Sequence, residues 1–198
     1  MTGKVIQLYG STPPQVATLP DLSDEELASL VSSAANQQAF AILVQRHARK
    51  AHAMAYRLLL NPTEAEDVVQ ESFTKYWQRP SAWNPDKGAK FGTWFTQVVL
   101  NASRDRLRKK PWQPLPDGDV LPYEETAEKI VMHSQLKALL LKAVSTLPQR
   151  QREALVLCVF EERSHKEAAD VLNISPKAVE SLIGRAKTHL RSYFSEKG

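Results

Sequence analysis

Cysteine, glycine and long apolar runs are scarce in this chain of 198 residues. Its single cysteine, Cys158, leaves no means of building a disulfide framework or a cysteine metal site. Seven glycines and no strictly alternating stretch argue against strands, and the one Asp-Gly pair stands in a proline-rich segment. No run of about eighteen apolar residues occurs, and the first residues lack the apolar core of a signal peptide. We therefore expect an all-α protein that does not insert into a membrane and resides in the reducing cytoplasm.

Signatures of catalysis are also missing. The chain has no glycine loop of the kind that cradles phosphate, no HExxH, no paired cysteines and no nucleophile motif. His47 and His52 are five residues apart rather than four, which favours packed or exposed histidines over a shared metal. We expect a protein that is not an enzyme and that uses neither a metal nor a cofactor.

The formal net charge of +4 is modest, but its distribution divides the chain. Residues 1–110 carry 14 basic and 10 acidic side chains, residues 129–198 carry 12 and 7, and residues 111–128 between them carry none and 5. Two basic modules joined by an acidic, proline-rich connector suit a polyanion that is held at two points. We predict two small helical domains at 21–110 and 129–198, a flexible linker at 111–128 and a flexible N-terminal tail at 1–20.

The capping and turn residues near the C-terminus predict a helix-turn-helix. Ser164, with Glu167 three residues later, is a capping box that starts a first short helix. Asn173 tolerates the left-handed backbone of a tight turn, and Ser175-Pro176 then caps a second helix. An ordinary helical hairpin with solvated lysines is the alternative, but DNA binding is favoured by the apolar residues Ile174, Val179 and Leu182. We expect the second helix to enter the major groove and to belong to a four-helix domain.

The first domain shows four further helical stretches. Two begin near Leu22 and Gln37, and a third begins at Asn61, where a proline and a glutamate follow the capping residue. The third stretch leaves one polar face, acidic near its start, which consists of Glu64, Asp67, Gln70, Glu71, Thr74 and Gln78. Such a face is ordinarily only solvated, because carboxylates at a helix N-terminus complement the helix dipole.

The fourth helical stretch follows a loop and ends in a cluster of cations. Pro80 closes the preceding helix, and the residues after it are rich in proline, asparagine and glycine, which is typical of a loop. The helix then carries one apolar stripe, made of Trp94, Phe95, Val98, Val99 and Ala102. Its last turns are basic, with Arg104, Arg106, Arg108, Lys109 and Lys110. Aromatic residues around a loop, followed by a basic helix, are the ingredients of a single-stranded nucleic-acid surface, although tryptophans are more often core residues.

Taken in order, these stretches resemble the extracytoplasmic-function (ECF) group of bacterial RNA polymerase sigma factors across residues 22–194. Four blocks carry the resemblance: AFAILVQRHARKAHAMAYRLL, NPTEAEDVVQESFTKYWQ, FGTWFTQVVLNASRDRLRKK, and LPQRQREALVLCVF leading into the helix-turn-helix. Each block alone is weak, and many regulators share the last, but their order and spacing together are highly specific.

The resemblance implies three interfaces. The helix after Asn61 would dock on the clamp helices of the largest polymerase subunit through Glu64, Asp67, Gln70 and Glu71. The loop and helix that follow would recognise and melt the promoter −10 element through Lys87, Lys90, Phe91, Asn101, Arg104 and Arg108. The second domain would read the −35 element through Lys177, Ser181, Arg185 and Lys187. Glu180 departs from the family, in which a basic residue often stands there, so the −35 sequence stays open.

The resemblance also implies a regulatory partner. An anti-sigma factor would hold the protein inactive by covering its polymerase-binding and DNA-binding surfaces. The linker would thread toward the active-site and RNA-exit channel of the polymerase. The alternative is a helix-turn-helix regulator whose N-terminal half senses a signal and which binds duplex DNA without polymerase.

Overall fold

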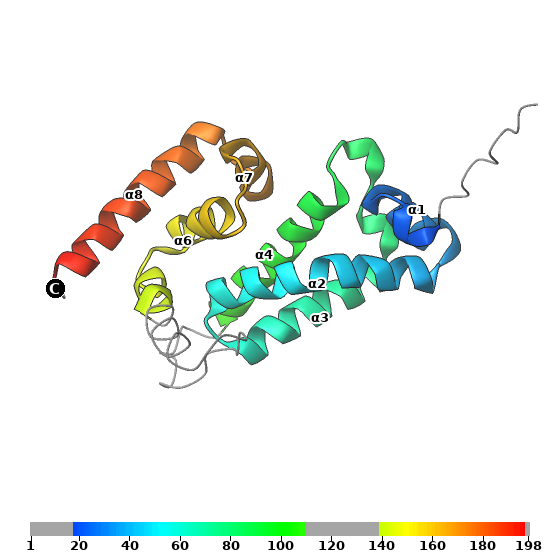
Figure 1. The fold of residues 1–198 in the computed structure, drawn as a ribbon, viewed down its shortest axis with the longest axis horizontal. Helices are drawn as coiled ribbons and strands as arrows, with labels where there is room; N and C mark the ends of the chain where they lie inside the picture. Colours follow the sequence, from blue (N-terminus) through cyan, green and yellow to red (C-terminus); the bar gives the residue numbers. More distant parts are fainter. Residues whose placement is uncertain (1–17, 110–138, 197–198) are drawn as a thin grey trace, which may run out of the picture.

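The computed structural model describes residues 18–109 and 139–196, and its regular structure there is entirely helical (Figure 1). The first domain contains, in chain order, η1 (Leu19–Asp21), α1 (Asp24–Ala34), α2 (Gln37–Leu59), α3 (Pro62–Gln78), the 3₁₀ turns η2 (Pro80–Ala82) and η3 (Pro85–Lys87), and α4 (Phe91–Lys109). The second contains helical residues 139–145, α6 (Gln149–Leu155), the π-helical turn η4 (Val156–Phe160), α7 (His165–Leu172) and α8 (Pro176–Ser195). The expected all-α class is confirmed for these residues.

Local capping interactions set where the helices begin. The side chain of Ser23 accepts a hydrogen bond from the Glu26 amide at 3.2 Å, and that of Asn61 accepts one from the Glu64 amide at 3.0 Å. Pro62 then occupies the first position of α3, where an N–H would have no partner within the helix. α3 therefore occupies the range that its cap and proline predicted.

The centre of the first domain is α2, which packs against α1, α3 and α4 (Figure 1). The buried stripe of α3 is the one that its spacing predicted, with Ala65, Val68, Val69, Ser72, Phe73 and Tyr76. The stripe of α4 differs from the prediction, because α4 packs on α2 and α3 and also on α7 of the second domain. Its buried residues are Phe91, Phe95, Val99, Leu100 and Ser103. The predicted core residues Trp94, Val98 and Ala102 are only partly buried.

The helix-turn-helix forms as predicted. Ser164 makes a capping box with Glu167, and Asn173 adopts the left-handed conformation, with a φ of 54°. Ser175 caps α8 by accepting a hydrogen bond from the Ala178 amide at 3.2 Å. α7 and α6 both pack on α8, which fixes this helix on its domain.

Residues 18–20, the last part of the predicted N-terminal tail, are described by the structure. Thr18 forms a capping box with Asp21, and the carbonyl oxygen of Pro20 accepts a hydrogen bond from Arg46 Nη2 at 2.6 Å. The end of the predicted tail therefore belongs to the first domain, because a guanidinium from α2 binds its backbone. The other parts of these predictions lie outside the described residues: the tail at 1–17, the linker at 111–128, and residues 129–138 of the second domain.

Candidate functional site

The polar face of α3 is exposed and acidic. Asp67, Gln70 and Glu71 line a surface hollow on it, together with Thr74, Lys75 and Gln78. About half of each carboxylate side chain is accessible, 51% for Asp67 and 49% for Glu71. Glu64, at the start of the helix, is more covered, with 20% of its side chain accessible. Three of the four residues expected to meet polymerase thus lie together on an open surface.

Arg106, on α4, binds the carboxylates of this face. Its guanidinium lies 2.6 Å from Glu64, 3.7 Å from Asp67 and in short contact with Glu71. Burial alone would lower the pKa of Arg106, but the hydrogen bond to Glu64 and the nearby carboxylate charges raise it on balance. Sequence reasoning did not assign this partner. The signal for it is the spacing of the three acids at i, i+3 and i+7, which places them on one helix face and favours a cation on a neighbouring helix.

The residues expected to contact the −10 element divide between α4 and the loop before it. Lys87 ends η3, and Lys90 is exposed immediately before α4. Asn101, Arg104 and Arg108 follow one face of α4 at i, i+3 and i+7, and Arg104 Nη1 donates to Asn101 Oδ1 at 3.0 Å. The structure therefore brings these three side chains of α4 together on one surface.

Phe91 does not reach this surface. Its side chain is wholly buried, with 0% accessible. Its ring lies among the rings of His47, Tyr76, Trp83 and Phe95, with centroids 5.2 Å to 5.9 Å away. The expected promoter contact of Phe91 is thus corrected to a packing role, because no face of its ring is open to a base.

Arg104 is already bound to the second domain. Its Nε and Nη2 donate to the two carboxylate oxygens of Glu153 on α6, at 2.8 Å and 2.7 Å. Glu153 is 1% accessible and also accepts a hydrogen bond from Gln149 at 2.9 Å. The hydrogen bonds to Glu153 raise the pKa of Arg104 despite its burial. A guanidinium engaged in this bidentate way is not available to a DNA phosphate.

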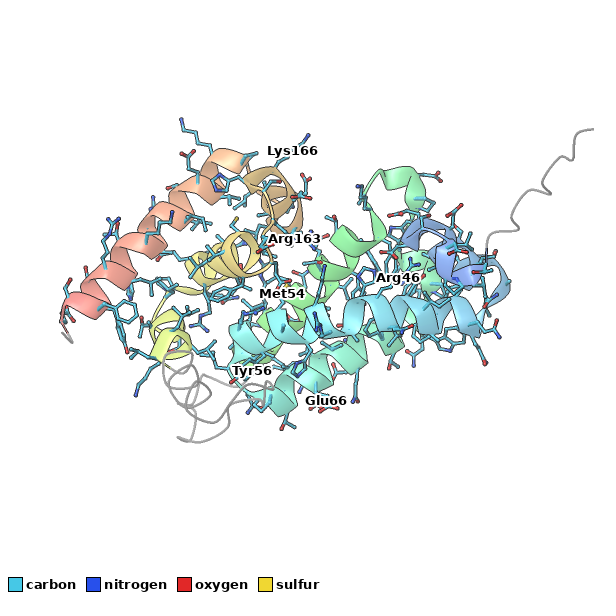
Figure 2. The ribbon with its side chains drawn as sticks, viewed as in Figure 1. Arg46, Met54, Tyr56, Glu66, Arg163 and Lys166 are labelled. Carbon is cyan, nitrogen blue, oxygen red and sulfur yellow. The ribbon has the colours of Figure 1, made fainter. Side chains whose placement is uncertain are left out.

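Further polar contacts join the two domains around this pair. Arg57 of α2 pairs with Glu161 at 2.9 Å. Arg163, labelled in Figure 2, donates to Thr96 of α4 at 2.7 Å. Arg152 is buried and donates to carbonyl oxygens of both domains, including one at the end of α2 at 3.0 Å. α4 packs on α7, and α2 packs on η4, across the same interface. The described parts of the two domains thus form a closed arrangement that covers part of α4.

The outer surface of α8 is open. Lys177, Ser181 and Arg185 are exposed and fall at i, i+4 and i+8, so they form a line along one face of the helix. Lys187 lies away from this line, about 160° around the helix from Arg185. It lines a separate hollow with Leu190, Arg191, Phe194 and Ser195. All four expected residues are exposed on α8, and three of them share one face.

Metal and membrane sites are absent from residues 18–109 and 139–196. No group of His, Cys, Asp and Glu side chains there is arranged to hold a metal ion, and no helix is long and apolar enough to cross a membrane. Cys158 is half-buried, and burial raises the pKa of its thiol.

Two sequence families match the chain, one in each domain. Sigma-70 region 2 matches residues 43–113, and Sigma-70, region 4 matches residues 137–190. The ECF RNA polymerase sigma factor SigE of Mycolicibacterium smegmatis is 32% identical over 183 residues, which are 88% of this chain and 70% of SigE. This chain belongs to the ECF group of RNA polymerase sigma factors.

As an ECF sigma factor, the protein binds core RNA polymerase and directs promoter-specific transcription initiation. CnrH, an RNA polymerase sigma factor of Cupriavidus metallidurans, is 32% identical over 182 residues, 86% of this chain and 94% of CnrH. The structure of CnrH in complex with the cytosolic domain of CnrY matches 88% of this chain and 99% of that chain, with a TM-score of 0.69 and 29% identity. RpoE of Bartonella quintana, solved with the anti-sigma factor NepR, shares the fold, with a TM-score of 0.62 and 20% identity over 79% of this chain and 96% of RpoE. The resemblance drawn from the four sequence blocks is confirmed.

Proposed function

We propose that this sigma factor holds core polymerase and melts the −10 element with its first domain, and reads the −35 element with its second. The observation that carries the proposal is that the acidic face of α3 and the polar face of α4 lie on adjacent helices joined by Arg106. The acidic face would meet the clamp helices of polymerase through Asp67, Gln70 and Glu71. The neighbouring face and the loop before it would follow the melted strand through Lys87, Lys90, Asn101, Arg104 and Arg108.

The second domain would supply the other DNA contact. Residues 21–110 would act as sigma region 2 and residues 129–198 as region 4, with residues 111–128 as the tether. α8 would enter the major groove of the −35 element through Lys177, Ser181 and Arg185. Two modest contacts on one chain give tight binding, because the second contact is nearly intramolecular once the first has formed.

The closed arrangement would be a resting state. Because Arg104 is hydrogen-bonded to Glu153 of the second domain, the two domains would have to separate before this face of α4 binds the promoter. A partner that keeps them together would keep the protein inactive, and we assign this role to an anti-sigma factor. The relative CnrH forms a complex with the cytosolic domain of CnrY, which supports a protein partner for this chain. The protein would act in the cytoplasm beside RNA polymerase, which would supply the chemistry.

Introducing positive charge on the exposed part of α3 tests the docking surface. Asp67→Lys combined with Gln70→Lys should lower the affinity for core polymerase at least about tenfold, because attraction at the interface is replaced by repulsion. Both side chains are exposed, so the helical content should stay that of the wild type. Fluorescence polarisation of the labelled protein, titrated with core enzyme, measures the affinity.

The matched control for docking is Asp170→Lys, which reverses a charge at an exposed position of α7. It should bind core polymerase with wild-type affinity. If the α3 double variant also binds normally, α3 does not form the interface and the proposed docking role is wrong.

Arg185→Ala is expected to weaken recognition of the −35 element selectively. The loss should be about 1–3 kcal/mol on promoters with the cognate base, if the guanidinium binds a base edge. Lys187→Ala is the control, because Lys187 does not share the face of Arg185. This substitution should change transcription from all −35 variants to the same extent. Run-off transcription on a panel of −35 variants measures both. A uniform loss with Arg185→Ala and a shallower salt dependence would instead assign this residue to a phosphate.

A further inference from the structure

We infer that the first turn of α1 positions the start of α4, through Asp24 and Glu25. The inference rests on the proposed role of α4 in melting the −10 element. Asp24 and Glu25 contact α2 and the first residue of α4 rather than its polar face, so these acids would act through the placement of that helix. Two separate contacts connect them with its first turn.

The direct contact is a cap supplied from another helix. The backbone N–H of Phe91, the first residue of α4, donates to Glu25 Oε1 at 3.0 Å, from a position 66 residues away in the chain. The residue before Phe91 is Lys90, whose side chain has no acceptor and cannot cap the helix itself. A carboxylate at a helix N-terminus satisfies an amide without a helical partner and complements the helix dipole. Glu25 therefore takes the place of the missing N-cap.

The second contact runs through a histidine of α2. Asp24 Oδ2 lies 2.7 Å from His47 Nε2. The ring of His47 packs edge-on against Phe91, with centroids 5.5 Å apart. A β-carbon on Gly92 would lie 3.3 Å from His47 Cε1, so the histidine is in direct contact with the first turn of α4. Asp24 thus fixes the ring on which that turn rests.

Arg46 of α2 anchors the segment from which these acids extend (Figure 2). Its guanidinium donates to Asp24 at 2.7 Å and to the carbonyl oxygens of Leu22 at 2.9 Å and Pro20 at 2.6 Å. The capping box of Ser23 holds the same turn from within α1. These contacts hold the turn from which both acids extend toward α4.

The contacts matter for function because α4 begins immediately after the loop that carries Lys87 and Lys90. Trp83 Nε1 donates to the carbonyl oxygen of Ala89 at 3.2 Å, which ties that loop to the core just before the helix. A shift of the first turn would move Lys90 and reorient the face that carries Asn101. Glu25 is thus a positioning residue for strand capture. Its side chain binds the backbone of α4 and does not contact DNA.

The test uses holoenzyme reconstituted from full-length protein and core polymerase. The probe is a labelled single-stranded oligonucleotide with the non-template −10 sequence of a promoter identified by run-off transcription. With Glu25→Ala the Kd for this strand should rise about tenfold, the order expected when a helix cap is lost. Glu25→Gln, whose amide oxygen can still accept from Phe91, should restore binding to within about twofold of the wild type. Affinity for core polymerase should be unchanged in both variants.

Two further measurements separate positioning from general damage. Exchange of the Phe91 amide hydrogen should be faster in Glu25→Ala and return toward the wild-type rate in Glu25→Gln. Ser33→Ala is the matched control, because this exposed side chain near the other end of α1 donates only to the Ser29 carbonyl oxygen within the helix, and it should bind the strand normally. Wild-type strand affinity in Glu25→Ala, or a parallel loss of core affinity, would overturn the inference. Failure of the wild-type holoenzyme to bind the strand would contradict the proposed role of α4, and the inference with it.

Discussion

Cutting the linker is expected to reduce −35-dependent initiation by about a hundredfold or more, although no described contact is removed. A protease site placed within residues 111–128 allows the same protein to be assayed before and after cleavage. The contact of the second domain with DNA then changes from a nearly intramolecular event to a bimolecular one. Run-off transcription with core polymerase, at concentrations where the uncut chain is just saturating, measures the loss.

The interface between the domains calls for two controls on this experiment. Contacts such as the Arg104–Glu153 pair can keep the cut halves together, so gel filtration must show that the halves separate at the assay concentration. Circular dichroism must show that both halves keep their helical content. If separated, folded halves initiate as well as the uncut chain, the tether is dispensable and the two domains do not act as linked contacts.

Arg152→Ala is expected to lower the free energy of unfolding by roughly 2–4 kcal/mol. The Arg152 guanidinium donates to the carbonyl oxygens of Leu58 at 3.0 Å, Ser145 at 2.6 Å and Leu147 at 3.2 Å. It therefore satisfies carbonyl groups near the ends of helices in both domains. Burial lowers the pKa of Arg152, the direction expected when a cation is removed from water. Its removal leaves those carbonyls without their charged donor and opens a gap at the domain junction.

Urea unfolding followed by circular dichroism measures this change. Arg150→Ala is the matched control, because this arginine lies two residues away with 56% of its side chain accessible. It should change the free energy of unfolding by less than about 0.5 kcal/mol. Equal unfolding midpoints for the two variants would show that the buried contacts of Arg152 contribute little to stability.

Helix boundaries in both domains could be predicted because a cap is made by residues three positions apart. Asn61, Ser164 and Ser175 each accept a hydrogen bond from the amide three residues later, as their patterns indicated. The buried stripe of α3 was predictable for a similar reason, since one side of that helix faces a single core. α4 packs against elements of both domains. The spacing of its apolar residues does not show that the second domain also covers part of the helix.

Contacts between distant segments could not be predicted in this way. Arg106 meets Glu64 across 42 residues of sequence, and Arg104 meets Glu153 across 49. No local pattern distinguishes an arginine that faces DNA from one that binds a carboxylate of another domain. Phe91 also could not be assigned from a local pattern. The resemblance implies a promoter contact for it, and only the five rings packed around it show that it is buried.

The central claim, that this protein selects promoters together with core polymerase, is tested most directly by run-off transcription on fragments of the genome that encodes it. We predict new transcripts only when the protein and core polymerase are both present, with start sites that share one −35 and one −10 element at a nearly constant separation. The protein alone should retain no specific fragment in a mobility-shift assay. Specific retention of duplex fragments by the protein alone, with no transcript that depends on it, would contradict the claim and identify a helix-turn-helix regulator instead.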